Sequence, residues 1–181
     1  ANFAEEVLVL DSNSIDETCE ISIAMGARVE KHEWMGFGNQ KNLAVSLANN
    51  EWVFVLDADE RITPNLQIEI QKILENPISD GYLVPRLNEF FGKKIKTCGL
   101  YPDYSLRLYK RSKGSFRNVA VHESVEIKGV VSKLNNHMMH LAYDNVDEFI
   151  KKQKHYSDLS NKKKNIIKAL FGPCWTFINL Y

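Results

Sequence analysis

The first half of the chain alternates short apolar runs with segments of helical periodicity. The apolar runs predict buried parallel strands, because strands covered on both faces are continuously hydrophobic; they cover residues 7–10, 27–29 and 52–56. Helices are predicted after each strand, over residues 14–26, over residues 39–48 and from Thr63-Pro64 onward. This alternating order predicts an α/β fold with an open, mostly parallel sheet flanked by helices.

The predicted helices carry local start and stop signals. Ser14 and Glu17 have the spacing of a capping box, and Gly26 suits the end of the same helix. Asn39 can cap the second helix, and Pro64 suits the first position of the third. In the third helix, residues at helical spacing form one apolar face: Leu66, Ile70, Ile73 and Leu74.

The second half of the chain changes character. Strands separated by glycine-containing loops are predicted over residues 81–87, 105–110 and 123–131. A polar, lysine-rich helix is predicted over residues 146–164, and an apolar, aromatic segment follows it. We therefore expect one domain over residues 1–145 and a basic, amphipathic helical tail over residues 146–181.

The composition is that of an ordinary globular protein. Of the 181 residues, 44% are hydrophobic and 25% are charged, which argues against a disordered or fibrous chain. The 23 basic and 23 acidic residues cancel, so the basic excess typical of nucleic-acid-binding proteins is missing. The three cysteines form no CxxC pair, no secretory signal opens the chain, and no apolar run is long enough to span a membrane. These features favour a reducing, cytoplasmic location.

Two acidic clusters follow predicted strands, at the ends where open α/β sheets bind their ligands. Asp57 and Asp59 stand one residue apart after the strongest strand, so their carboxylates can converge on Mg²⁺ or Mn²⁺; the alternative is a solvated acidic turn. Asp11, Ser14 and Asp16 combine a strand-end carboxylate with a helix start, which can bind a base, a ribose or a phosphate. The alternative here is a helix start that is merely well capped.

Three strings carry a resemblance to a known family: VLVLDSNSIDET, GFGNQKNLA and EWVFVLDADERITP. They resemble the nucleotide-sugar half of family 2 glycosyltransferases, which have the GT-A fold. The later strings YPDYSLRLYKR and VAVHESVEIKG are similar to the bacterial branch that includes lipopolysaccharide core β-1,4-glucosyltransferases. The resemblance implies an inverting transfer of a sugar, glucose in that branch, from a UDP-linked donor. The implied acceptor is a lipopolysaccharide-core or similar lipid-linked glycan.

The resemblance also implies which residues bind the donor. Asp11 would contact the nucleoside, and Asp16 would support its loop. Lys41 and Asn42 match a basic–Asn pair that lies near the nucleotide. Arg107 belongs to a strand with period-two alternation, and its side chain faces either a donor phosphate or simply solvent.

The reaction needs a metal site and a base. Asp57 and Asp59 match the family's metal-binding motif, with Asp59 as the direct ligand, and His140 is a candidate further ligand. An inverting transferase also needs a general base to take the proton of the acceptor hydroxyl. Glu123 lies in the region where the family places this base, and Asp103 is the rival candidate. The alternatives are an exposed strand carboxylate for Glu123 and a hydrogen-bonded core histidine for His140.

The sequence departs from the family pattern in two ways. Asn13 and Ile15 stand where the family usually has Gly and Thr, and asparagine tolerates the left-handed backbone that such a turn needs. The chain also begins at what resembles the family's second strand, so the first strand and helix are missing from the expected sheet. Two other functions remain open: a phosphatase of the haloacid dehalogenase type, in which Arg61 would replace an expected hydroxyl residue, and a nucleotide-binding or membrane-docking module without catalysis.

The zero net charge is an average over two unequal parts. Residues 151–181 contain seven lysines and one acid, Asp158, whereas residues 1–150 contain 16 basic and 22 acidic residues. Lysines followed by aromatic residues suit an anionic membrane surface; the alternative is a solvated helix whose apolar end packs on the domain. A lipid-linked acceptor would make such docking useful, so we expect a peripheral position on the inner face of a bacterial inner membrane.

Overall fold

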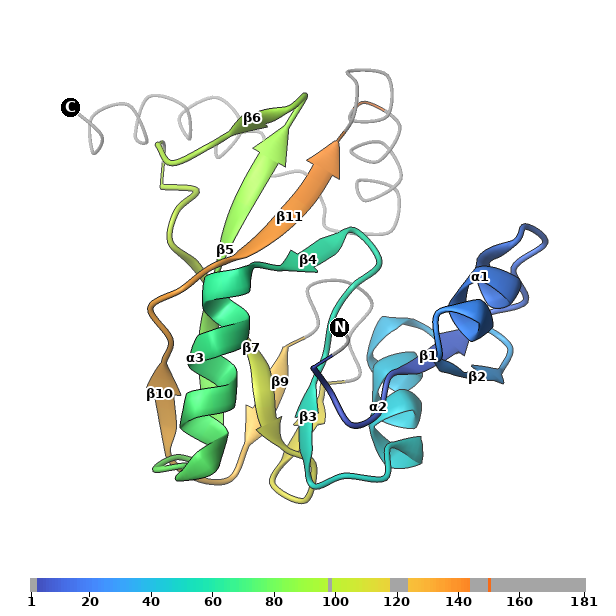
Figure 1. The fold of residues 1–181 in the computed structure, drawn as a ribbon, viewed down its shortest axis with the longest axis horizontal. Helices are drawn as coiled ribbons and strands as arrows, with labels where there is room; N and C mark the ends of the chain where they lie inside the picture. Colours follow the sequence, from blue (N-terminus) through green and yellow to red (C-terminus); the bar gives the residue numbers. More distant parts are fainter. Residues whose placement is uncertain (1–2, 98, 118–123, 144–149, 151–181) are drawn as a thin grey trace, which may run out of the picture.

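The described part of the protein is organised around a seven-stranded β-sheet (Figure 1). The computed structural model describes residues 3–97, 99–117, 124–143 and 150. The helices in this part of the chain are α1 (Thr18–Ala24), α2 (Phe37–Leu47) and α3 (Pro64–Glu75). The strands are β1 (Leu8–Asp11), β2 (Arg28–Lys31), β3 (Trp52–Phe54), β4 (Glu60–Ile62), β5 (Gly81–Phe90), β6 (Lys93–Lys94), β7 (Asp103–Lys110), β8 (Gly114–Phe116), β9 (Val125–Ile127), β10 (Val131–Lys133) and β11 (Met138–Tyr143).

The large sheet mixes parallel and antiparallel strands. Its order is β3-β7-β5-β11-β4, and β6 and β10 also pair with β5. Strand β5 is parallel to β10 and β11, whereas the pairs β3–β7, β5–β7 and β4–β11 are antiparallel. The α/β class is confirmed, but the sheet is not mostly parallel. The reason is that β7 follows β5 without the crossover helix that a parallel neighbour requires.

Two hydrophobic clusters form the core on the two faces of β7. Successive residues of a strand point to opposite faces, so Leu108 and Tyr109 belong to different clusters. The Leu108 cluster includes the buried side of α3 and consists of Leu66, Ile70, Tyr82, Val84, Leu108, Leu134 and Met138. In the Tyr109 cluster, Val53 and Phe116 pack with Val45 and Ala48 at the end of α2. The large sheet is therefore held between α3 and the layer that contains α2.

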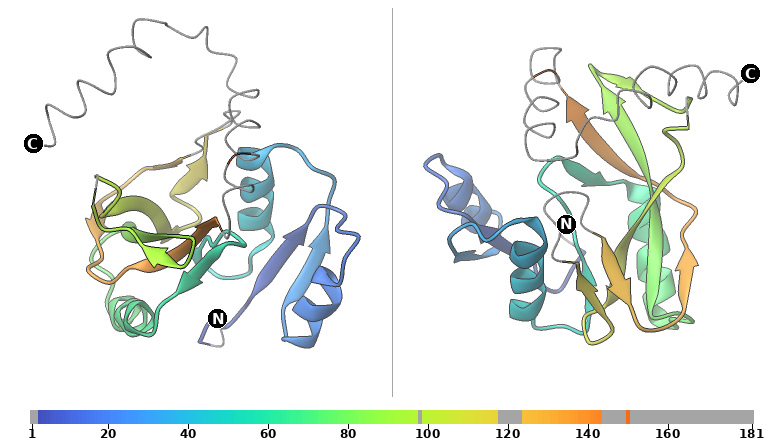
Figure 2. Two further views of the ribbon diagram at one scale, coloured as in Figure 1. Left: turned by 90° about the horizontal axis from the view of Figure 1, so that it is seen from above. Right: turned by 180° about the vertical axis from the view of Figure 1, so that it is seen from behind.

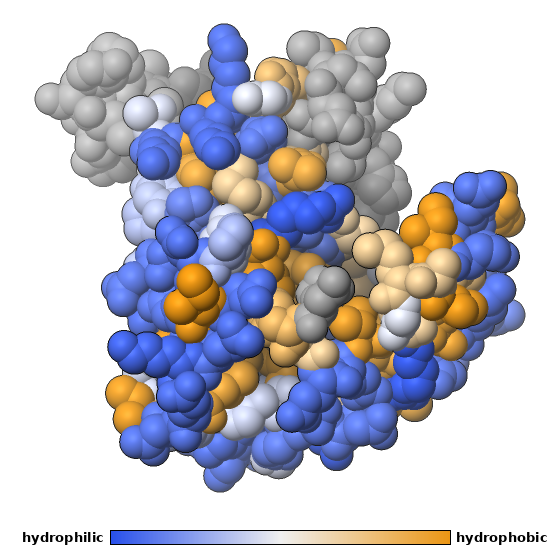
Figure 3. Space-filling view, viewed as in Figure 1, coloured by the Kyte–Doolittle hydropathy of each residue, from blue (hydrophilic) through white to orange (hydrophobic). Residues whose placement is uncertain are grey.

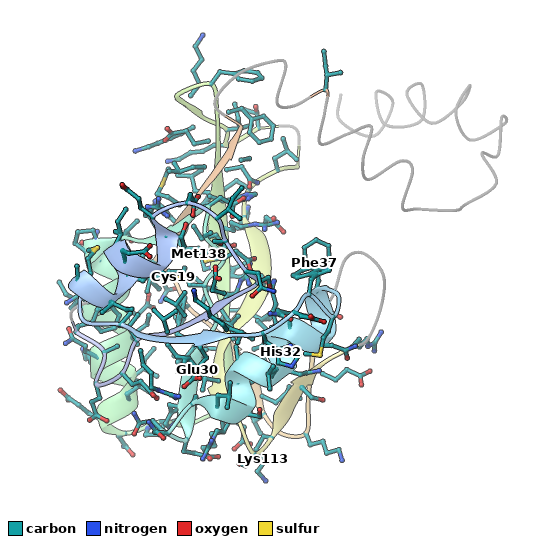
Figure 4. The ribbon with its side chains drawn as sticks, turned by 90° about the vertical axis from the view of Figure 1, so that its right-hand side faces the viewer. Cys19, Glu30, His32, Phe37, Lys113 and Met138 are labelled. Atoms are coloured by element: carbon teal, nitrogen blue, oxygen red, sulfur yellow. The ribbon has the colours of Figure 1, made fainter. Side chains whose placement is uncertain are left out.

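Helix α2 joins the large sheet to a smaller lobe. Strands β1 and β2 form a separate parallel pair, which lies with α1 to one side of the large sheet (Figures 1 and 2). Helix α2 contacts both β1 and β8. Figure 4 views this side, with Cys19 on α1 and Phe37 at the start of α2. Figure 3 shows hydrophobic residues on the surface of this lobe, and the exposed residues of its first helix and the turn after it include Ile21, Ile23 and Met25.

Two predicted helix starts are wrong. Helix α1 begins at Thr18, after Glu17, and no side chain caps it, so Ser14 and Glu17 form no capping box. The reason is that both the amide and the hydroxyl of Ser14 donate to the carboxylate of Asp11. Helix α2 begins at Phe37 behind Gly36, whose positive φ of 90° places the start two residues before Asn39.

The second half contains more strands than the pattern predicted. The predicted strand over residues 123–131 is divided into β9 and the start of β10 by a turn at Gly129. Strands β6, β8 and β11 were not predicted there, and neither was β4 in the first half. Strands β4 and β11 combine charged or histidine side chains with a short apolar run. The predicted tail over residues 146–181 lies outside the described residues apart from residue 150, so the two-part organisation stays a prediction. None of the described helices is long and apolar enough to cross a membrane.

The start of α3 agrees with the prediction and supplies a test of the fold. The hydroxyl of Thr63 accepts a hydrogen bond from the Leu66 amide at 3.3 Å and donates one to the His137 carbonyl at 2.7 Å. We expect Thr63→Ala to lower the free energy of unfolding by about 1–2 kcal/mol in urea denaturation, because a cap and a link to β11 are lost together. Thr63→Ser keeps the hydroxyl and should remain close to wild type; an equal loss in both variants would contradict this explanation.

Candidate functional site

The loop after β3 carries the first acidic cluster, and a buried carboxylate holds it in place. The Asp57 amide donates to Glu60 Oε2 at 3.0 Å, and the Glu60 amide donates to the Asp57 carbonyl at 3.0 Å. The Leu141 amide of β11 donates to the Asp59 carbonyl at 2.8 Å. The loop is therefore closed on itself and fixed to the sheet, so the two aspartates leave it in defined directions.

Charged side chains from four helices and strands meet beneath this loop. Arg107 Nη2 from β7 lies 2.5 Å from Glu60 Oε1 and 2.8 Å from Asp57 Oδ2. Lys41 Nζ from α2 lies 2.7 Å from Asp57 Oδ1. Arg86 from β5 lies 3.7 Å from Glu60 and is bound by Asp103 at 2.6 Å. Positive and negative groups thus alternate across the sheet, from Lys41 at one end to Asp103 at the other.

Burial and neighbouring positive charges have opposite effects on the pKa values of Glu60 and Asp57. Burial raises the pKa of Glu60 above its ordinary value, and the charge of Arg107 offsets only part of this effect. Burial also acts to raise the pKa of Asp57, but the charges of Arg107 and Lys41 outweigh it and the pKa is lowered. Asp57 is therefore ionised at neutral pH and is engaged by two cations of the protein itself.

Asp59 lies beside a histidine of the neighbouring strand. Asp59 Oδ2 lies 3.4 Å from Nε2 of His140 on β11, and 41% of the Asp59 side chain is exposed. On the other side of the ring, His140 Nδ1 lies 2.7 Å from Oδ1 of Asn88, which is buried. The prediction that His140 lies near the metal motif is consistent with this geometry, and Asn88 is a partner that the sequence did not indicate.

The second acidic cluster lies beside the first. Asp11 is buried, and the hydrogen bonds from Ser14 lower its pKa below the ordinary value. Asn13 has a φ of 63°, so it adopts the left-handed backbone expected for it. Gln40 Nε2 on α2 lies 2.9 Å from the Ser12 hydroxyl, while its neighbour Lys41 contacts Asp57. Consecutive residues of α2 therefore connect the two acidic clusters.

The remaining predicted site residues occupy different surroundings. Asp16 accepts a hydrogen bond from the Thr18 amide at 3.1 Å and so supports the start of α1. Both ends of the Asn42 amide bind the backbone of Phe116, which favours a structural role over contact with a donor. Arg107 does not face solvent, because only 6% of its side chain is exposed. Glu123 lies outside the described residues.

Glu60 is the residue of the candidate site whose burial sequence reasoning missed. It belongs to the acidic cluster after the strand, but nothing local indicates that its side chain is fully buried. Its partners, Arg86 and Arg107, come from strands 26 and 47 positions further along the chain. A buried ion pair of this sequence separation has no local pattern, so only the structure reveals it.

The residues at the loop suit a hard divalent cation. Asp59 offers a carboxylate oxygen and His140 an imidazole nitrogen, both of which Mn²⁺ accepts, while Mg²⁺ prefers the oxygen. No group of three or more candidate metal-binding side chains occurs in the described part of the chain. Two protein ligands are sufficient if substrate phosphates complete the coordination, which is the common arrangement for Mg²⁺. Asp57 is the weaker candidate for direct contact, since Lys41 and Arg107 engage it.

Comparison with known sequences assigns the family. Residues 2–118 match the sequence model of Glycosyl transferase family 2. The chain therefore belongs to this family, and the match decides against a haloacid dehalogenase-type phosphatase. An uncharacterized glycosyltransferase of Rickettsia typhi is 30% identical over 179 residues, covering 92% of this chain and 61% of the relative. The chain thus spans less than two thirds of the length of that relative.

Two further similarities concern a named relative and a solved structure. A lipopolysaccharide core biosynthesis glycosyltransferase, LpsC of Rhizobium meliloti, is 28% identical over 193 residues, covering 97% of this chain and 71% of the relative. The crystal structure of S. aureus TarS 1–349 in complex with UDP-GlcNAc superposes with a TM-score of 0.53 at 16% identity. It covers 77% of this chain and 50% of TarS. This likeness supports the GT-A fold expected from the sequence.

The buried pair beneath the loop supplies a test with a defined pH dependence. In Arg107→Met, Glu60 loses its closest cation, and burial then raises its folded-state pKa further. A carboxyl with a raised folded-state pKa destabilises the fold as the pH rises past its ordinary value, 4.5. We therefore expect a loss of about 3–5 kcal/mol at neutral pH in urea denaturation, and a smaller loss near pH 4.

Two control variants separate the charge effect from other causes. Arg107→Met combined with Glu60→Gln removes both charges and should recover much of the lost stability. Arg117→Met breaks the exposed pair with Glu126, whose side chains are 57% and 60% exposed, and should change stability by less than about 1 kcal/mol. Equal losses at both pH values, without recovery in the double variant, would contradict the assignment.

Proposed function

We propose that this domain carries out an inverting, metal-assisted transfer of a sugar from a nucleotide-sugar donor to a glycan acceptor. The observation that carries the proposal is that one loop at the end of β3, within a family 2 domain, holds Asp57 against Lys41 and Asp59 beside His140. Two carboxylates, a cation and an imidazole are the groups needed to receive a metal-bound diphosphate. Because the chain spans only part of its relatives, the proposal concerns the full-length protein.

Each group at the loop has a role in binding the donor. Asp59 and His140 would hold Mg²⁺ or Mn²⁺, which when bound stabilises the negative charge on the departing diphosphate. Lys41 would contact a phosphate while Asp57 keeps it in position. Asp11 and Ser14, connected to the same helix through Ser12 and Gln40, would contact the nucleoside. The UDP-GlcNAc bound in the TarS crystal supports a UDP-linked donor.

The base that activates the acceptor is proposed to be Glu123, with Asp103 as the alternative. Asp103 Oδ2 accepts two hydrogen bonds from Arg86, at 2.9 and 2.6 Å, so only Oδ1 is left to take a proton. Arg86 in turn lies beside Glu60, which places Asp103 at the far end of the charged network from Lys41. This position suits a structural carboxylate, and it favours Glu123 for the base.

The acceptor is proposed to be a lipopolysaccharide-core or similar lipid-linked glycan, and the sugar to be glucose. The name of the Rhizobium meliloti relative supports a role in lipopolysaccharide core biosynthesis. The seven lysines of residues 151–181 support docking of the protein to an anionic membrane surface, since that is where a lipid-linked acceptor is found.

The metal ligand Asp59 supplies the direct test of this proposal. Asp59→Ala in the full-length protein should lower the rate of sugar transfer from UDP-sugar by at least about 10²-fold, because the charge on the leaving diphosphate loses its stabilisation. Glu126→Gln is the control: it removes an exposed carboxylate of β9 that pairs with Arg117 and is not part of the candidate site, and it should leave the rate unchanged. Transfer at the wild-type rate by Asp59→Ala would contradict the proposed function.

A further inference from the structure

We propose that Asn88 is a positioning residue: it holds the hydrogen of His140 on Nδ1 and thereby turns the ring's Nε2 toward Asp59 as a cation ligand. The ligand half of this statement rests on the proposed function. The half that concerns the hydrogen and its tautomer does not, because it follows from the contact with Asn88, which at 2.7 Å is shorter than the 3.4 Å contact with Asp59. No sequence pattern indicated Asn88.

The two residues face each other across a strand pair. His140 of β11 and Asn88 of β5 are register partners in parallel strands, so their side chains leave the same face of the sheet. Asn88 Oδ1 lies 2.7 Å from His140 Nδ1, and His140 Nε2 lies 3.4 Å from Asp59 Oδ2. Asn88 is 6% exposed, whereas 41% of the Asp59 side chain is exposed. The ring thus lies between a buried amide and a partly exposed carboxylate.

The orientation of the Asn88 amide follows from its other partner. Asn88 Nδ2 lies 3.3 Å from the backbone carbonyl oxygen of Leu100. A carbonyl oxygen only accepts hydrogen bonds, so the NH₂ end of the amide must face Leu100. The oxygen end therefore faces His140. With the amide reversed, the Asn88 oxygen would face the Leu100 carbonyl oxygen, and the amide NH₂ would face His140 Nδ1.

The amide orientation then fixes the hydrogen on the ring. The amide oxygen also only accepts, so His140 Nδ1 must carry the hydrogen between them. This holds for the neutral ring and for the cationic ring alike. Nε2 is consequently the nitrogen whose lone pair is available in the neutral ring, and it is the nitrogen that faces Asp59. Histidine ligands of metals commonly donate their other ring N–H to a carbonyl or carboxylate in this way.

The conservative variant separates positioning from packing. Asn88→Asp keeps an oxygen acceptor for the Nδ1 hydrogen, whereas Asn88→Leu has similar size and no acceptor. Loss of a partner that orients a metal-binding histidine typically weakens metal binding about 10–100-fold. We therefore expect weaker Mn²⁺ binding in Asn88→Leu by that factor, and binding closer to wild type in Asn88→Asp. Asn65→Leu, at an exposed position of α3, is the matched control.

The test combines two measurements on the full chain. Nitrogen-15 NMR of histidine-labelled protein without metal, at alkaline pH, reports which ring nitrogen carries the hydrogen; His140→Gln assigns the signal. The Nδ1–H tautomer is expected in the wild type and in Asn88→Asp, and a shift toward Nε2–H in Asn88→Leu. Electron paramagnetic resonance then measures the Mn²⁺ affinity of the same samples.

Each outcome bears on one part of the proposal. An Nε2–H tautomer in the wild type would overturn it without any variant, even if Asn88→Leu failed to fold. Equal Mn²⁺ affinity in wild type and Asn88→Leu would overturn the positioning role. An Nδ1–H tautomer in a wild type that binds no Mn²⁺ would contradict the metal-assisted function and the ligand half, and would leave the tautomer half confirmed.

Discussion

The ion pair between Glu60 and Arg107 is the interaction on which the site depends. The Glu60 side chain has no exposed surface, so its charge is tolerated only because Arg107 lies 2.5 Å away. Arg107 belongs to β7, which is paired on both sides within the sheet, and this fixes where the loop after β3 can lie. The same guanidinium reaches Asp57, so a single buried cation contacts both carboxylates.

The proposed function depends on the residues of the loop that stay accessible above this ion pair. Glu60 and Arg107 are buried beneath the loop, whereas the Asp59 side chain beside His140 is 41% exposed and can be reached by a ligand. Lys41 is held at the same loop by its ion pair with Asp57. Because ion pairs already fix Asp57 and Glu60, the loop can accept a cation and a diphosphate without rearranging these carboxylates. Such preorganisation stabilises the charge that develops on a leaving group.

Sequence patterns predicted correctly those features that depend on residues close together in the chain. Thr63, Pro64 and the apolar spacing after them predicted the start and buried face of α3 correctly, and the acids after the strand at residue 52 marked the loop that holds the site. Contacts with distant partners could not be predicted: Asn42 binds the backbone of Phe116, and Arg107 pairs with the buried Glu60. The prediction of a mostly parallel sheet was also wrong, because β7 returns antiparallel to β5 without a crossover helix.

The most direct test of the account is whether the nucleotide binds through the cation at this loop. Calorimetry of the full-length protein with UDP, in the presence and absence of Mn²⁺, measures this without requiring an acceptor. The account predicts binding that needs Mn²⁺ and that is lost in Asp59→Ala but retained in Glu126→Gln. UDP affinity that is the same with and without Mn²⁺, or unchanged by Asp59→Ala, would contradict it.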